Sequence, residues 1–178
     1  MKLCYYGNPI LRKKSEPIGE ITDEIRQLAA EMVHFIDHND GIGLSAVQIG
    51  KLIRLFVLRR YLYKPDGTWT VSEPYIYVNP KILECSKETW VSEEGCLSIP
   101  KLHLPVERPM RIQVESTKLD GTKVVEELEG INARVILHEN DHLNGVLYID
   151  RVAEKDLKPA QAKLREIKKK YALSKFRT

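Results

Sequence analysis

The sequence is poor in cysteine, with three in 178 residues, at positions 4, 85 and 96. So small and odd a set excludes a disulfide-stapled mini-protein and fits a reducing compartment, so we expect a cytoplasmic protein. Long apolar runs are also lacking, because no stretch approaches the roughly 18 residues that a membrane-spanning helix needs. The start of the chain lacks the apolar segment of a signal peptide, and we expect no membrane partner.

A large excess of charge of one sign is lacking as well, because the formal net charge is only +3. That value does not indicate nucleic-acid binding, but residues 154–178 carry nine Lys or Arg against three Asp or Glu. The content of 43% hydrophobic and 30% charged residues excludes a disordered chain and is ordinary for one domain of about 100–200 residues. We expect one domain, with a mildly acidic body at 1–152 and a basic C-terminal helix and tail at 153–178.

Helices are expected towards both ends of the chain and strands between them. Apolar residues at helical spacing predict an amphipathic helix over 22–38, a second over 131–143, and a third with Leu157, Tyr171 and, in its first turn, Pro159. β-Branched and aromatic residues predict strands over 52–59, 75–84, 111–119 and 122–129, the last two joined by a two-residue Asp120-Gly121 turn. Residues 63–74 are interpreted as a surface excursion. This order favours an α+β fold over a parallel βαβ sheet.

The sharpest motif is HENDH at residues 138–142. Positions i and i+4 of a helix lie on one face, so both imidazoles can point at one cation, with Glu139 beside them. The alternative is two surface histidines on an ordinary helix. Ile131 and Val135 share the face of the histidines, which predicts that the imidazoles are buried, and a metal ion is a natural partner for a buried imidazole.

Two further segments could complete a site. Catalytic metal sites usually have three protein ligands and one open position, and Cys96, within EGCLS at 94–98, is the best candidate for the third ligand. Its alternative is a small buried hydrophobe. The segment GIGLSAVQ at 41–48 lacks the lysine and the spacing of phosphate-binding loops, which excludes nucleotide binding. It suits a loop that offers an N–H donor to a substrate, or a plain turn before a strand.

Together and in this order, the three motifs resemble those of peptide deformylases, the enzymes that remove the formyl group from new protein N-termini. The family pattern G-φ-G-L-A-A-x-Q matches 41–48 except that Ser45 replaces the first alanine, a change from which we expect little effect. EGCLS and HExDH are complete, NPILR at 8–12 is similar to the family's opening, and the resemblance spans roughly residues 5–152. It implies antiparallel β-sheets packed around a central metal-binding HExxH helix, with an N-terminal amphipathic helix and a C-terminal helix.

The resemblance also implies a role for each motif residue. One divalent metal ion, natively Fe²⁺ but replaceable by Zn²⁺, Ni²⁺ or Co²⁺, would be held by Cys96, His138 and His142. Glu139 would take a proton from a water that the metal activates and pass it to the leaving amine. The Gln48 side-chain amide and the Leu97 backbone N–H would stabilise the oxyanion.

The expected substrates are N-formylmethionyl peptides and nascent chains. Ile42, Ile131 and Val135 are candidates for the methionine pocket, unless they are simply core, and Gly43 and Leu44 would pair with the peptide backbone. His103 stands where many family members carry an arginine. Three charged residues either orient the ligands or form exposed ion pairs, namely Glu94, Arg108 and Asp141.

Two rival functions are considered. A zinc endopeptidase shares HExxH, but it takes its third ligand downstream of the helix and would leave EGCLS unexplained. A non-catalytic, metal-stabilised module could instead dock on the ribosome through the basic segment. The basic residues of that segment could contact ribosomal RNA, or they could be only the solvated face of a helix. They are Lys163, Arg165, Lys168, Lys169 and Lys170.

Overall fold

The computed structural model describes residues 1–172, so the end of the predicted basic tail, 173–178, lies outside the described residues. The α-helices of the described part are α1 (Asp23–Asp37), α2 (Gly130–Leu143) and α3 (Glu154–Ala172). Short 3-10 helices are η1 (Pro9–Arg12), η2 (Ala46–Ile49) and η3 (Tyr148–Asp150). The strands are β1 (Gly43–Ser45), β2 (Leu55–Leu58), β3 (Tyr61–Tyr63), β4 (Trp69–Val71), β5 (Tyr75–Cys85), β6 (Thr89–Cys96), β7 (Ile99–Pro109), β8 (Arg111–Thr117) and β9 (Lys123–Glu129).

The strands form one main sheet and two separate hairpins. The main sheet has five strands in the order β1-β2-β5-β8-β9, and each neighbouring pair is antiparallel. Strands β6 and β7 pair with each other, as do β3 and β4. The predicted class, a mixture of helices and antiparallel sheet, is confirmed.

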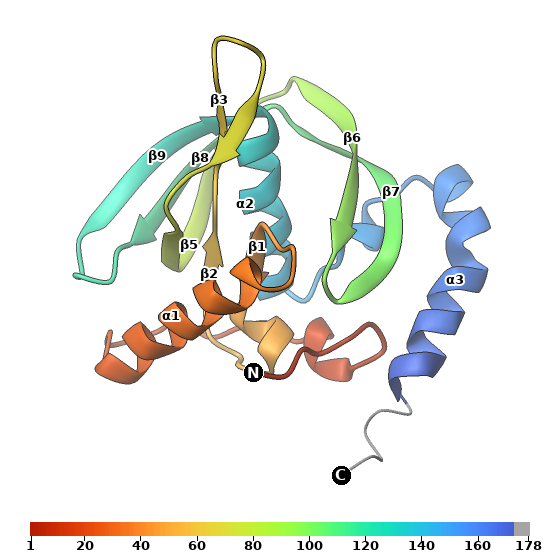
Figure 1. Ribbon diagram of the computed structural model, residues 1–178, viewed down its shortest axis with the longest axis horizontal. Coiled ribbons are helices and arrows are strands. Elements are labelled where there is room, and N and C mark those ends of the chain that lie inside the picture. Colours follow the sequence, from red (N-terminus) through yellow and green to blue (C-terminus); the bar gives the residue numbers. More distant parts are fainter. Residues whose placement is uncertain (173–178) are drawn as a thin grey trace.

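Helix α2 lies between the main sheet and the β6–β7 hairpin (Figure 1). Its apolar side packs on the sheet, where Ile136 and Leu137 meet Phe56 and Val114 in one buried cluster. Helix α1 covers another part of the sheet, with Met32 among the residues buried there. Helix α2 and the β6–β7 hairpin therefore belong to different layers, and each contributes side chains to the region where the two layers meet.

Helix α3 runs along the outer side of β7 (Figure 1). Ala160, Leu164 and Ile167 are buried in one cluster with Leu104 and Val106 of β7. The helix begins at Glu154, so Pro159 lies in its second turn and not in the first turn as predicted. No helix within the described residues is long and apolar enough to cross a membrane.

The β8–β9 turn differs from its prediction. It is not a two-residue loop, because Lys118 pairs with Thr122 and leaves three residues between them. Gly121 takes a φ of 89° there, the left-handed position that closes a three-residue hairpin loop. The surface excursion predicted over 63–74 is present, because residues 63–71 are exposed and belong to the β3–β4 hairpin.

Candidate metal centre and active site

Helix α2 places its histidines against the hairpin. The residues of the HENDH motif occupy the C-terminal half of α2, where Glu139 is 3% and His142 is 1% exposed. His138 is mostly buried, with 11% of its side chain exposed. The alternative of two surface histidines on an ordinary helix is therefore wrong.

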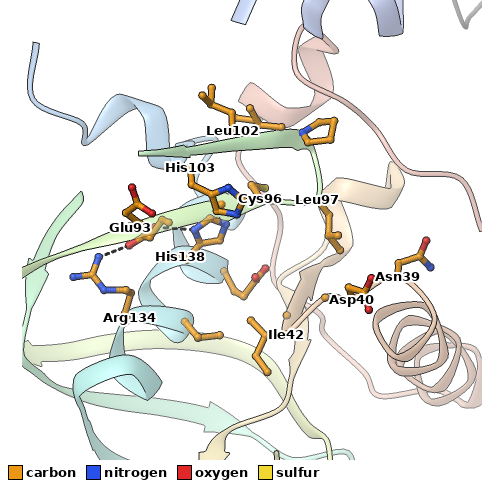
Figure 2. Close-up of a pocket in the computed structure, with 18 of the residues that line it drawn as sticks. Asn39, Asp40, Ile42, Glu93, Cys96, Leu97, Leu102, His103, Arg134 and His138 are labelled. Carbon is orange, nitrogen blue, oxygen red and sulfur yellow. Dashed lines mark hydrogen bonds and ion pairs between the residues drawn. The ribbon is translucent and has the colours of Figure 1, made fainter. Parts of the chain in front are cut away.

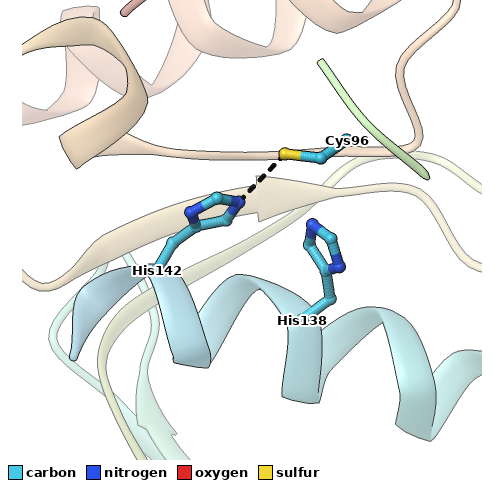
Figure 3. A group of neighbouring side chains, drawn as sticks. All are labelled: Cys96, His138 and His142. Atoms are coloured by element: carbon cyan, nitrogen blue, oxygen red, sulfur yellow. Dashed lines mark hydrogen bonds between the residues drawn. The ribbon is translucent and has the colours of Figure 1, made fainter. Parts of the chain in front are cut away.

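Cys96 reaches the histidines from the end of β6. The ligand atoms of Cys96, His138 and His142 all lie within 4.8 Å of one another. Cys96 Sγ is 3.3 Å from His142 Nε2, and Figure 3 shows the sulfur above the two rings on α2. Gly95 precedes the cysteine, and a Cβ there would lie 2.5 Å from the ring of His103, so a glycine makes room for that imidazole.

The donor set fits one divalent metal ion. Glu94 Oε2 lies 2.9 Å from His138 Nδ1, and an ionised carboxylate can only accept, so Nδ1 carries a proton and Nε2 is left for a ligand. The second ring nitrogen of His142, Nδ1, is buried without a hydrogen-bond partner among the described residues. One thiolate and two imidazoles that converge, with Cys96 and His138 at a cavity, are the arrangement of a three-ligand site with an open position.

Burial and neighbouring charges shift the pKa values of the α2 residues. Burial raises the pKa of Glu139 and outweighs the lowering by His138 and by the Ser45 hydroxyl. Burial also lowers the pKa of His142, as does the charge of His138, which favours the neutral imidazole that binds metals. Burial would lower the pKa of His138, but its interactions with Cys96 and Glu94 outweigh burial and raise that pKa.

A buried charge network supports the ligands. Arg108 donates to both carboxylate oxygens of Glu94, at 2.7 and 2.8 Å, and to Asp141 at 2.7 Å. Arg151 donates to both oxygens of Asp141 at 2.5 Å. The side chains of Glu94, Arg108 and Asp141 are at most 8% exposed, so the alternative of exposed ion pairs is wrong for them.

The network includes a member that the sequence analysis missed. Arg134, one turn before His138 on α2, donates to Glu94 at 2.7 Å and to the backbone oxygens of Trp90 and Val106 at 2.8 and 2.9 Å. The signal was an arginine among the apolar residues of a buried helix, which requires a partner of opposite charge.

A cavity of about 760 Å³ opens beside the candidate ligands, and Cys96 and His138, but not His142, are among the residues that line it. Figure 2 shows Cys96, His103 and His138 gathered at one side of it and Ile42 on another. The predicted site residues that line the cavity are Ile42, Gly43, Gln48, Cys96, Leu97, Ile131, Val135, His138 and Glu139. Leu44 is not among the lining residues, because the whole residue is buried in the core beneath α1, whereas its neighbour Gly43 lines the cavity.

The glycine-containing segment lies beside Glu139. Gln48 Nε2 donates to Ser98 Oγ at 3.1 Å and lies 3.5 Å from Cys96 Sγ, so the amide is held next to the proposed ligands. A Cβ at Gly43 would be 2.6 Å from Glu139 Oε1, and only a glycine allows this approach. Ser45 Oγ lies 2.7 Å from Glu139 Oε2, a contact that the expectation of little effect from this residue did not foresee.

Comparison with known proteins adds independent findings. The family model for polypeptide deformylase matches residues 1–158. The peptide deformylase of Thermotoga sp. (strain RQ2) is 41% identical over 152 residues, which are 85% of this chain and 87% of that protein. The peptide deformylase of Bradyrhizobium sp. (strain ORS 278) is 46% identical over 145 residues, 81% of this chain and 82% of that protein.

Solved structures agree with the sequence relatives. Peptide deformylase 1B of Arabidopsis thaliana superposes with a TM-score of 0.87 at 33% identity, covering 98% of this chain and 93% of that one. The peptide deformylase of Thermotoga maritima has a TM-score of 0.77 at 41% identity, covering 85% of this chain and 97% of that one.

Proposed function

The chain belongs to the peptide deformylase family, a family of metallohydrolases that remove the N-formyl group from nascent polypeptides, and we propose which of its residues carry out this reaction. The observation that carries the proposal is the convergence of Cys96, His138 and His142 within 4.8 Å at a cavity that Glu139 also lines. The zinc endopeptidase and the non-catalytic module are not favoured by these relatives.

The proposed chemistry follows from the groups at the cavity. A divalent ion held by the three ligands would polarise the formyl carbonyl and make a nearby water more acidic. Glu139 accepts the proton of that water, for which its raised pKa suits it, while the water oxygen attacks the formyl carbon and the carbonyl oxygen gains negative charge. Glu139 then gives the proton to the nitrogen of the leaving amine as the C–N bond breaks, so that formate is released. Gln48 Nε2 and the Leu97 N–H donate to the oxygen that gains negative charge.

The substrate is held on the apolar side of the same cavity. We assign the methionine side chain to the space between Ile42, Ile131 and Val135, all of which line the cavity. The formylated peptide continues along the edge strand β1, where the backbone of Gly43 and Leu44 can pair with an extended chain.

The native metal is proposed to be Fe²⁺, with Zn²⁺, Ni²⁺ or Co²⁺ as replacements. The ligand types support this range, because imidazole and thiolate bind all four ions. A thiolate ligand also needs a reducing compartment, and none of the three cysteines is in a disulfide, which supports a cytoplasmic location.

Association with the ribosome is proposed for α3. The apolar face of the helix is buried on β7, whereas Arg165, Lys168, Lys169 and Lys170 are exposed on the rest of its surface. Reversal of Arg165 and Lys169 to Glu removes basic charge without touching the packed face. Wild-type protein should co-sediment with ribosomes in a salt-dependent manner and the double variant should not. Equal sedimentation of both would contradict the proposal.

The main test uses anaerobically purified protein and a formyl-methionyl peptide. Formate release and metal content are measured on the same sample, with Fe²⁺, Ni²⁺ and Zn²⁺ forms compared. An unformylated peptide with internal bonds serves as the control substrate. Internal cleavage without formate release would favour the endopeptidase and overturn the assignment.

A further inference from the structure

Ser45 and Glu139 meet although 94 residues separate them in the sequence. Ser45 is fully buried in β1, and its hydroxyl Oγ lies 2.7 Å from Glu139 Oε2 and 2.9 Å from the backbone oxygen of Glu139. The other carboxylate oxygen, Oε1, lies against Gly43, where a Cβ would be 2.6 Å away. The two oxygens of the Glu139 carboxylate therefore have different surroundings: Oε2 lies at hydrogen-bonding distance from a hydroxyl, and Oε1 lies against Gly43, a residue that lines the cavity.

The hydroxyl is itself firmly placed. Strand pairing sets the backbone of Ser45 opposite Phe56. The Ser45 N–H also donates to Gln48 Oε1 at 2.8 Å, so one short segment connects the amide of Gln48 with the carboxylate of Glu139. A rigid donor matters here because the terminal torsion of a glutamate side chain is broad and does not fix the carboxylate plane by itself.

We propose that Ser45 is a positioning residue for the deformylation reaction, whose hydroxyl holds Glu139 Oε2 so that Oε1 is the oxygen that exchanges the proton. The inference rests on the proposed role of Glu139 as the proton acceptor. Oε2 accepts from the hydroxyl while the carboxylate is ionised, and it still accepts as the carbonyl oxygen when Oε1 carries the proton. The carboxyl group thus keeps one orientation while Oε1 takes a proton from water and passes it to the leaving amine.

The test compares Ser45→Ala with the wild type and with Ser116→Ala, which removes another buried serine hydroxyl, in β8, at a residue that does not line the cavity. Alanine adds no atoms, so Ser45→Ala is expected to fold. All proteins are loaded with the same metal, and kcat, KM, thermal midpoint and metal content are measured with a formyl-methionyl peptide. We expect Ser45→Ala to lower kcat about tenfold, with KM within about twofold of the wild type, since misplacing a reacting group affects the chemical step.

The readouts separate positioning from a structural role. Metal content and thermal midpoint should stay at wild-type values in Ser45→Ala, and Ser45→Thr, which keeps the hydroxyl, should recover most of the lost kcat. A kcat within about twofold of the wild type, or a loss confined to KM, would overturn the inference. A fall in kcat that follows loss of metal or of folded protein would do the same. If the wild type and Ser116→Ala release no formate, the proposed function fails as well.

Discussion

The buried carboxylate of Glu94 is hydrogen-bonded to several side chains around the candidate metal centre. It accepts two hydrogen bonds from Arg108, one from Arg134 and one from His138, and it is 6% exposed. The two guanidinium groups supply the compensation that a buried negative charge needs. Because Glu94 also fixes the proton of His138 on Nδ1, it sets which nitrogen faces the metal position.

Glu94→Gln is expected to destabilise the fold and weaken the metal site together. The substitution leaves Arg134 buried without a negative partner and leaves Arg108 with Asp141 alone, and breaking a buried pair typically costs about 3–5 kcal/mol. Metal affinity should fall about 10–100-fold because His138 loses the negatively charged acceptor that orients it. Urea unfolding and metal titration measure the two effects. The neighbouring Glu93→Gln, at an exposed position, is the control and should change stability by less than about 0.5 kcal/mol.

Glu139→Gln is expected to separate metal binding from chemistry. Glutamine has nearly the same shape, and Ser45 can still donate to its side-chain oxygen, but an amide cannot accept the proton of water at neutral pH. Metal content should therefore match the wild type, whereas formate release should fall by at least about 100-fold. Retention of activity would show that Glu139 is not the proton acceptor.

The sequence predicts the candidate metal ligands, but it does not predict which residues hold the side chains of the site in place. Cys96 and the two histidines stand in short motifs whose spacing expresses their chemistry, and the structure brings the three together. The contact of Ser45 with Glu139 and that of Arg134 with Glu94 join distant segments. Such contacts depend on how the layers pack, and no local pattern reports them.

At the level of elements, the site depends on a hairpin that the sequence did not reveal. Strand β6 carries Glu93, Glu94 and Gly95 near its end, residues that are depleted in strands. Its charged Glu94 points inward because Arg108 and Arg134 neutralise it, which reverses the usual alternation of apolar and polar faces. The strands expected over 75–84 and 111–119 were predictable because most of their buried residues, such as Val78, Ile112 and Val114, are apolar.

The end of α2 is expected to be sensitive to substitution at Gly145. Gly145 has a φ of 73°, and a Cβ there would lie 2.5 Å from the backbone oxygen of Arg12. Gly145→Ala should combine backbone strain with a clash against an immobile atom and cost more than about 2 kcal/mol. Gly121→Ala is the matched control, because its φ is also positive but no atom lies within 4 Å. Denaturant unfolding should show the smaller loss, about 1 kcal/mol, for Gly121→Ala.

At the scale of the whole molecule, α3 belongs to the same packed body as the site. The cluster that buries Leu164 and Ile167 also contains Ile99 and Tyr148, and the ring of Tyr148 is stacked 6.0 Å from that of His138. The division of this one domain at 152/153 remains a prediction about organisation, and the buried contacts of α3 with β7 agree with a single domain.

Truncation after Ala153 is expected to destabilise the protein. It exposes the apolar surface of β7 that Ala160, Leu164 and Ile167 cover, at a cost of about 25 cal/mol for each Å² uncovered. The thermal midpoint should fall by more than about 5 °C, and the truncated protein should bind hydrophobic dyes. The control is Arg165→Glu combined with Lys169→Glu, which keeps the packed face and should keep the thermal midpoint. Equal midpoints for truncated and intact protein would contradict a packing role.

Stability at acid pH is expected to depend on Glu94. Burial alone would raise its pKa, but hydrogen bonds from Arg108 and His138 outweigh burial and hold the pKa well below the ordinary value of about 4.3. The unfolded chain therefore binds a proton at this position at acidities where the folded protein does not. The stabilisation that ionised Glu94 contributes to the folded protein is complete above about pH 5 and is lost progressively as the pH falls below that value.

Unfolding of the metal-free wild type and of Glu94→Gln between about pH 3 and 7 measures this loss. Both proteins carry the same other carboxyl groups, so the contributions of those groups to the pH dependence cancel in the comparison. His138 has an ordinary pKa of about 6.5 and is protonated in both the folded and the unfolded wild type below about pH 5. As the pH falls below about 4.3, the stability difference between the two proteins should shrink steadily. A difference that stays constant down to the lowest pH would show that the Arg108 and His138 contacts do not keep Glu94 ionised.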